Sequence, residues 1–125
     1  NNSGKKEKKR MISGIGVDII EVERVKKFLE KTPRALKKVF TPNEASYCLS
    51  KRHKYQHLAA RFAAKEAFFK ALGKKIQWTD VELVNLPTGK PELSIKGKER
   101  LSFSRSHVSI SHLTEYAVAV VILEE

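Results

Sequence analysis

The sequence predicts an α+β fold, with helices in most of the first half of the chain and strands in most of the second. Between positions 21 and 72, apolar residues recur every three or four positions, which is the spacing of a helix face. After position 80, the apolar runs are short and are separated by turn residues, as expected for strands. A further apolar strand precedes the helices. Strands and helices are therefore mixed along the chain, which is typical of an α+β protein.

The first predicted strand covers residues 11–20 and is apolar on both faces apart from Asp18. Gly14 and Gly16 lie within this strand and carry no Cβ atom. Glycine inside a strand often marks a place where another backbone approaches closely. We therefore expect that another element can pack directly on this strand.

Two helices are predicted after the strand. The first covers residues 21–31, and its core face, at helical spacings of three and four, consists of Val22, Val25 and Leu29. A short second helix is expected to begin at Thr32 and Pro33. Threonine is a favourable N-cap, and proline is favoured at the first helical position.

Two more helices are predicted before the strands of the second half. Thr41 and Glu44 have the spacing of a capping box, so a third helix is expected to begin there. The basic segment 51–54 then leads into a long helix over about residues 55–72. Gly73 is placed to be the C-cap of this helix, because glycine readily adopts the left-handed conformation that ends many helices.

The second half is predicted to be mostly strand. Its strands are expected at 80–86, 91–96, 107–111 and 115–123. Residues 87–90 have the chemistry of a turn, and residues 97–101 are expected to form a short helix. The last two strands are expected to form a closing hairpin. Its final run is apolar at nearly every position, so it should be central in the sheet and covered on both faces.

The chain of 125 residues has a formal net charge of +11 at pH 7. Residues 1–10 contribute +4, from five basic residues and Glu7, and the remainder contributes +7. Such a balance favours an acidic partner: a nucleic acid, an anionic lipid, a phosphate ligand or an acidic protein. Residues 1–10 lack apolar side chains and are expected to be a disordered tail. We expect residues 11–125 to form one domain, and Met11 is a candidate natural start.

Other features of the composition limit the location of the protein. The single Cys48 excludes an internal disulfide and favours a reducing, cytoplasmic location. It is expected to be a small buried hydrophobe rather than a nucleophile. The apolar runs are shorter than the ~20 residues that a membrane span needs, so no span is expected.

Two carboxylates lie in apolar stretches, where a charge is costly without a partner. Asp18 is in the opening strand, and Glu66 is in the core-facing stripe of the long helix, between Phe62 and Phe69. A divalent cation such as Mg²⁺, which prefers carboxylate oxygens, would satisfy both. Two ordinary interpretations stay open: Asp18 can complement the dipole of the next helix, and Glu66 can pair with Lys70 on the surface.

Both carboxylates belong to an ordered set of motifs that resembles the holo-acyl-carrier-protein synthases. The two main motifs are residues 14–19 (GIGVDI) and 61–71 (RFAAKEAFFKA). Three weaker matches are residues 40–44 (FTPNE), 89–91 (GKP) and 108–112 (VSISH). The resemblance covers about residues 11–123, nearly the whole chain.

This resemblance implies an enzyme of fatty acid biosynthesis. Its members transfer 4′-phosphopantetheine from coenzyme A to a serine of apo acyl carrier protein, with Mg²⁺ as cofactor, and release adenosine 3′,5′-bisphosphate. The implied fold is that of the 4′-phosphopantetheinyl transferases, an antiparallel sheet packed with one long helix and shorter helices. A homotrimer with active sites at the subunit interfaces is implied as well.

The resemblance also implies roles for individual residues. Asp18 and Glu66 would bind Mg²⁺, and together with Lys70, which would stabilise the pyrophosphate leaving group, they are the expected catalytic residues. The residues expected to bind coenzyme A are Arg61, Lys65, Gly89, Lys90, Pro91 and His112. The general base stays open between Glu66, a metal-bound water and a water held by another acid. Glu44 is a poor candidate for the base because its capping role already explains it.

The first helix has a basic face that includes one aromatic residue, opposite its core face. This combination resembles a protein-docking surface, and the family binds its acidic carrier proteins with this helix. The expected docking residues are Arg24, Lys27, Phe28, Lys31, Arg34 and Lys38. The alternative is an ordinary solvated face with Phe28 covered by a neighbour.

Two rival functions are a basic nucleic-acid-binding module and a non-catalytic interaction protein that keeps the fold. The first is disfavoured because the chain has no recognised nucleic-acid motif and few aromatic residues within its basic runs. We therefore expect no nucleic-acid partner.

Overall fold

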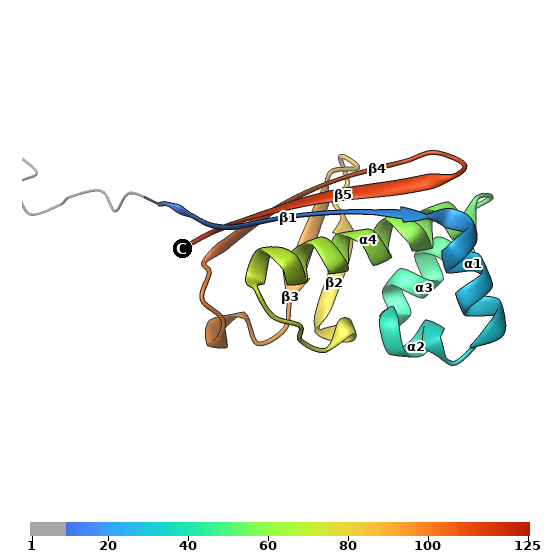
Figure 1. Ribbon diagram of the computed structural model, residues 1–125, viewed down its shortest axis with the longest axis horizontal. Helices are drawn as coiled ribbons and strands as arrows, with labels where there is room; N and C mark the ends of the chain where they lie inside the picture. The colour runs from blue at the N-terminus through green and yellow to red at the C-terminus, as the bar shows by residue number, and fades with distance from the viewer. Residues whose placement is uncertain (1–9) are drawn as a thin grey trace, which may run out of the picture.

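The computed structural model describes residues 10–125 and confirms the α+β class (Figure 1). Residues 1–9 of the predicted tail lie outside the described residues. The helices are α1 (Val22–Lys31), α2 (Ala35–Val39), α3 (Pro42–Leu49) and α4 (Lys54–Leu72), with the 3₁₀ helices η1 (Trp78–Asp80) and η2 (Lys98–Arg100). The strands are β1 (Ile12–Glu21), β2 (Val81–Asn85), β3 (Pro91–Ile95), β4 (Arg105–His112) and β5 (Tyr116–Glu124). Among residues 10–125, no helix combines the length and the apolar character that crossing a membrane requires.

The strands form two antiparallel sheets. The larger sheet has the order β1-β5-β4, so the closing strand β5 is central, as its apolar sequence predicts. The smaller sheet pairs β2 with β3. Helix α4 lies along one face of the larger sheet, with β2 and β3 on the other side of the helix and α1, α2 and α3 grouped at one end (Figure 1). The long helix is therefore the central element on which the other parts pack.

The two glycines of β1 allow α4 to lie directly on the strand, as the sequence predicts. A Cβ atom on Gly14 would stand 1.9 Å from the carbonyl oxygen of Ala71, and one on Gly16 would stand 1.8 Å from that of Ala67. Any side chain at either position would therefore collide with the helix backbone. This close contact brings the next inward-facing residue of β1, Asp18, up against α4.

Two hydrophobic clusters share α4. In one, the predicted core face of α1, consisting of Val22, Val25 and Leu29, packs with α2, α3 and the first half of α4. In the other, the second half of α4 packs with β2 and the inner face of the larger sheet. Cys48 is fully buried in the first cluster, and this burial raises the pKa of its thiol to about 11, which fits the expectation of an inert hydrophobe.

The helix ends confirm two predictions and correct one. The Thr41–Glu44 capping box forms at the start of α3, and Gly73 ends α4 in the left-handed conformation with φ of 83°. The prediction that Thr32 begins α2 is wrong. Thr32 is the C-cap of α1 and donates its N–H to the Phe28 carbonyl, while its own carbonyl accepts from Ala35, the first residue of α2. A threonine between two close helices can cap the end of the first or the start of the second, and here Thr32 caps the end of α1.

The outer face of the larger sheet, on the side away from α4, is apolar and exposed along β1 and at Tyr116 and Val120 of β5. On β1, Ile15, Val17 and Ile19 are each more than half exposed. Pairing in register places Val17 opposite Val120, which is also exposed. The expectation that β5 is covered on both faces is therefore met on one face only within a single chain. An exposed apolar patch of this kind marks a surface for contact with another molecule.

Candidate active site

Asp18 and Glu66 line one cleft of about 460 Å³. Asp18 comes from β1 and Glu66 from α4, and their side chains are 16% and 29% exposed. Both carboxylates are thus held in the protein surface yet remain open to a ligand. The other walls of the cleft include Arg24 and Phe28 of α1 and the Trp78 ring.

An ammonium group stands beside each carboxylate. Lys70 Nζ lies 3.2 Å from Asp18 Oδ1 and donates to the Val17 carbonyl at 3.0 Å. Lys75 Nζ lies 3.8 Å from Glu66 Oε1 and 4.6 Å from the centroid of the Trp78 ring. Sequence reasoning missed Lys75, which follows the end of α4 and belongs to no recognised motif. The alternative interpretation, a surface pair between Glu66 and Lys70, is not what the structure shows, because each side chain pairs with another residue.

The carboxylate pair fits a magnesium ion. Among residues 10–125, no group of three or more His, Cys, Asp or Glu side chains is arranged to hold a metal ion. Mg²⁺ does not need such a cage, because it usually keeps several waters and binds one or two carboxylates together with phosphate oxygens of a substrate. Asp18 and Glu66, both partly exposed in one cleft, would supply that donor set.

Arg61 lies on another face of α4 and is only 2% exposed. Its guanidinium donates to Asn85 Oδ1 at 2.7 Å and stacks 4.4 Å from the centroid of the Tyr47 ring, and Asn85 in turn donates to the Gly89 carbonyl at 3.2 Å. Within the described residues, Arg61 Nε is buried without a hydrogen-bond partner. The structure thus joins Arg61 to the 89–91 turn through Asn85, a residue that sequence reasoning did not single out.

His112 lies at the end of β4, close to the first turns of α4. Its Nδ1 is 2.9 Å from Gln56 Oε1, and its ring packs edge-on against His57 with centroids 5.0 Å apart. His57 also contacts the Tyr47 ring, which connects His112 to the Arg61 stack. Burial, followed by the nearby positive charges, lowers the pKa of His57 from its usual 6.5. We call Tyr47, His57, Arg61, Asn85 and His112 the basic cluster.

The predicted site residues are therefore spread over several places within one chain. Asp18 and Glu66 line the cleft, and Lys70 is paired with Asp18. Arg61 and His112 belong to the basic cluster, and neither is among the residues that line the cleft. Of the expected nucleotide set, Gly89 contacts Asn85 of the basic cluster, whereas Lys90 and Pro91 line a separate surface pocket between β3 and β4.

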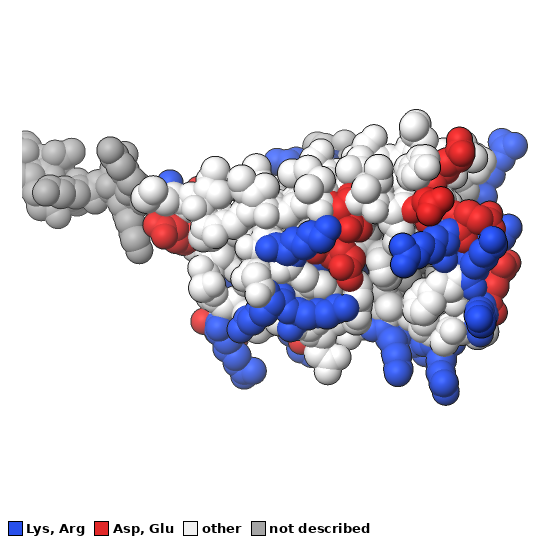
Figure 2. Space-filling model, in the orientation of Figure 1, with Lys and Arg blue, Asp and Glu red and all other residues white. Residues whose placement is uncertain are grey.

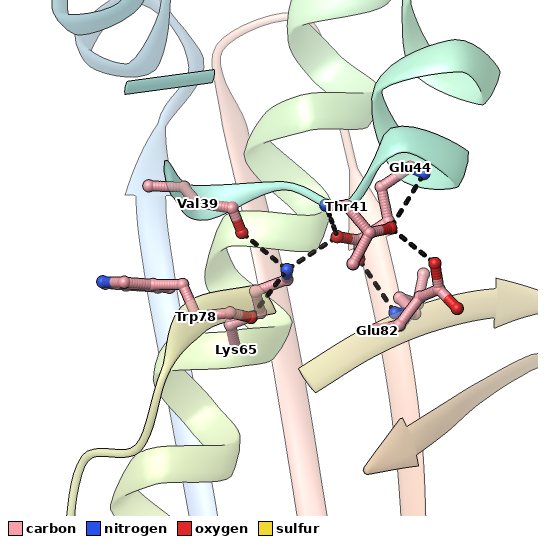
Figure 3. Close-up of polar contacts among 7 residues, drawn as sticks. Val39, Thr41, Glu44, Lys65, Trp78 and Glu82 are labelled. Carbon is pink, nitrogen blue, oxygen red and sulfur yellow. Dashed lines mark hydrogen bonds and ion pairs between the residues drawn. The ribbon is translucent and has the colours of Figure 1, made fainter. Parts of the chain in front are cut away.

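The Lys65 side chain is buried, so coenzyme A cannot reach it. Its side chain is 0% exposed, and its ammonium donates to Glu44 Oε1 at 2.6 Å, to the Val39 carbonyl at 2.6 Å and to the Trp78 carbonyl at 3.1 Å (Figure 3). These three bonds use all three of its protons. The structure thus corrects the expectation that Lys65 binds coenzyme A. Glu44 is equally enclosed, in agreement with its rejection as the general base.

The predicted docking residues are all exposed, and Arg24 and Phe28 also line the cleft beside the carboxylates. Phe28 is 43% exposed, so it is not covered by a neighbour within the chain. Figure 2 shows basic side chains, with acidic ones among them, at the end of the molecule formed by α1 and α2. A partner held on this end would reach the cleft directly.

Comparison with known proteins defines the class. Residues 14–121 match the 4′-phosphopantetheinyl transferase superfamily. The holo-[acyl-carrier-protein] synthase of Geobacter sulfurreducens is 47% identical over 124 residues, covering 91% of this chain and 98% of its own. A crystal structure of the Bacillus anthracis holo-(acyl-carrier-protein) synthase in complex with CoA (3′,5′-ADP) superposes with a TM-score of 0.80 at 39% identity, covering 92% and 98% of the two chains. The Neisseria meningitidis holo-[acyl-carrier-protein] synthase gives a TM-score of 0.84 at 31% identity, covering 92% and 100%.

The fold and the matched residues therefore define an enzyme of the phosphopantetheinyl transferase class. Within that superfamily, the chain belongs to the holo-[acyl-carrier-protein] synthases.

Proposed function

We propose that this enzyme requires Mg²⁺ to transfer 4′-phosphopantetheine from coenzyme A to a serine of apo acyl carrier protein, and that it releases adenosine 3′,5′-bisphosphate. The observation that carries this proposal is the convergence of Asp18 and Glu66 in one open cleft, with Lys70 paired to Asp18. Two carboxylates and an ammonium suit a pyrophosphate, which needs both a metal ion and a counter-charge where its bond breaks.

Asp18 and Glu66 would hold the metal ion, which when bound supplies Lewis-acid stabilisation to the pyrophosphate oxygens. Lys70 is half exposed in its pair with Asp18, so its ammonium can turn to a phosphate oxygen bound next to Asp18. There it would neutralise the charge that develops on the leaving group as the phosphoanhydride breaks. The serine hydroxyl of the carrier enters beside Arg24 and Phe28, which line the same cleft.

The nucleotide part of coenzyme A is assigned to Gly89, Lys90 and Pro91 and to the surface of the basic cluster, where Arg61, which is only 2% exposed, holds Asn85 and the Tyr47 ring in place. Because Arg61 and His112 do not line the carboxylate cleft of their own chain, we propose that one subunit supplies the carboxylates and its neighbour part of the nucleotide site. The exposed apolar outer face of the sheet supports such an assembly. The family resemblance sets the number of subunits at three. Light scattering should then report about three times 14.2 kDa, and a fully active monomer would contradict the shared site.

The partner is an acidic carrier protein, and its proposed docking face consists of Arg24, Lys27, Phe28, Lys31, Arg34 and Lys38. The net charge of +11 supports an acidic partner. The test of the whole proposal is to incubate the enzyme with coenzyme A, Mg²⁺ and apo carrier, and to measure the mass of the carrier protein. A gain of one phosphopantetheine group, lost when the divalent ion is chelated, supports it, and an unmodified carrier would overturn it.

A further inference from the structure

We propose that the buried ammonium of Lys65 is a positioning group that holds two wall segments of the carboxylate cleft, at Val39 and Trp78, in place relative to Glu66. The inference rests on the proposed function, because it concerns the shape of the same cleft. It gives a role to a lysine that no ligand can reach.

The two backbone acceptors of Lys65 belong to residues that line the cleft. Val39 is the last residue of α2 and Trp78 the first of η1, and both side chains contribute to the cleft wall together with Glu66. Lys65 Nζ donates to both carbonyls, and Lys65 is the direct neighbour of Glu66 on α4. One ammonium therefore joins the helix that carries a catalytic carboxylate to both wall segments, the end of α2 and the start of η1.

The Glu44 carboxylate fixes this ammonium from the other side. Glu44 accepts the Thr41 N–H at 3.0 Å and the Leu83 N–H at 2.9 Å, in addition to Lys65 (Figure 3). Its oxygens thus accept hydrogen bonds from the backbone at the start of α3 and from the backbone of β2. Burial lowers the pKa of Lys65, and the adjoining Glu44 carboxylate opposes this by favouring the charged ammonium. A buried pair of this kind often adds little net stability, so a role in shaping the cleft accounts for it better than stability alone.

The Trp78 ring packs on the part of α4 that carries Glu66, so a movement of η1 would change the surroundings of Glu66. It stacks on Phe62 with centroids 5.1 Å apart and meets Phe69 edge-on at 5.0 Å. Phe62 and Phe69 lie on either side of Glu66 along α4, and Lys75, the partner of Glu66, stands over the same indole. Release of the Trp78 carbonyl would let this ring move across the face of α4 that carries Glu66. A shift of about 1 Å at such a site can lower turnover by about 100-fold.

The test compares Glu44→Gln with the double variant Lys65→Met/Glu44→Gln. The single variant keeps the Lys65 amine, which can donate to its two carbonyl acceptors whether or not it is charged, whereas the double variant removes this amine without leaving a buried unpaired carboxylate. We expect Glu44→Gln to keep most of its turnover. The double variant, once shown by circular dichroism to be folded at the assay temperature, should lose about 10-fold to 100-fold in kcat, with a smaller change in the KM for coenzyme A.

Trp78 is the only tryptophan in the chain, so its fluorescence reports the cleft wall without any turnover. In the double variant, acrylamide should quench this emission more strongly than in Glu44→Gln. A folded double variant with unchanged emission and turnover would overturn the inference.

If neither variant folds, Val39→Ala and Trp78→Ala test the wall itself, since neither change removes a carbonyl acceptor. Full kcat in both would overturn the inference as well. An inactive wild-type enzyme would count against the proposed function, while the emission comparison would still test the positioning.

Discussion

The ammonium of Lys70 bridges α4 and β1 by lying 3.2 Å from Asp18 Oδ1 and 3.0 Å from the Val17 carbonyl oxygen. The lysine side chain is 54% exposed and the aspartate 16%, so water screens the pair, which contributes at most about 1 kcal/mol to stability. A pair this weak can exchange partners readily. Under the proposed function, a phosphate would draw the ammonium away and a metal ion would take its place beside Asp18.

Replacing Lys70 by alanine should lower turnover more than affinity for coenzyme A. In the proposed reaction its charge is needed mainly as the phosphoanhydride bond breaks, so the loss should fall on kcat. Steady-state kinetics with each substrate varied, together with calorimetric binding of coenzyme A, measure the two effects separately. Lys74→Ala is the matched control, because Lys74 is an exposed lysine just beyond the end of α4. An effect of Lys70→Ala confined to binding would make Lys70 a substrate anchor only.

Gly16→Ala should damage both stability and activity. The new methyl group would stand 1.8 Å from the Ala67 carbonyl oxygen, and neither backbone can move aside without a substantial cost in free energy. We expect a loss of about 1–3 kcal/mol in the free energy of unfolding. Turnover should also fall, because β1 must move away from α4 and carry Asp18 away from Glu66. Urea unfolding and the transfer assay measure the two losses, with Ser13→Ala, at an exposed position of the same strand, as the control. Wild-type stability would contradict the close packing of these two elements.

Arg24→Glu and Lys31→Glu should each raise the KM for the carrier, and Lys31→Glu, which lies outside the cleft lining, should leave the affinity for coenzyme A unchanged. Each change reverses a charge on the exposed face of α1, which would then repel an acidic partner. The wild-type KM for the carrier should itself rise with salt, because exposed charges are screened. Arg100→Glu, on the exposed 3₁₀ helix η2, changes the net charge equally and is the control. If all three variants behave alike, net charge rather than this face governs binding.

His57 should remain neutral to a lower pH than an ordinary histidine. Its pKa is lowered from 6.5, first by burial and then by His112 and the nearby Arg61. A folded pKa below the unfolded value means that neutral His57 contributes stability that is present above the unfolded pKa and is lost as pH falls through the folded one. NMR titration of the imidazole should give a midpoint below 6.5, and below that pH the wild type should lose more stability than His57→Gln. A midpoint at or above 6.5 would contradict this placement.

Local rules predicted the parts of the fold that depend on neighbouring residues. The Thr41–Glu44 capping box, the end of α4 at Gly73 and the core face of α1 follow from spacing within one element. The glycines of β1 indicated close packing because only a missing Cβ permits it. Thr32 was assigned to the wrong helix because two helix ends compete for it, and the sequence does not show which one prevails.

The roles of the lysines could not be separated in the same way. Lys65 and Lys70 lie on the same helix and in the same motif, yet one is fully buried and the other half exposed. What separates them is Glu44, 21 residues before Lys65 in the sequence, which folds over Lys65 and not over Lys70. Lys75 was missed for a similar reason, since its contact with Glu66 depends on how the chain turns after α4.

The most direct test of the account is the intact mass of the carrier protein after incubation with coenzyme A, Mg²⁺ and matched enzymes. Wild type and Glu99→Gln, which alters an exposed carboxylate on η2, should add one phosphopantetheine group per carrier, and none to a carrier whose acceptor serine is replaced by alanine. Asp18→Asn and Glu66→Gln, which keep the size of each side chain but remove a metal-binding charge, should fold, lose most of the activity and require more Mg²⁺ for what remains. A carrier modified at the wild-type rate by either variant at low Mg²⁺ would contradict the account.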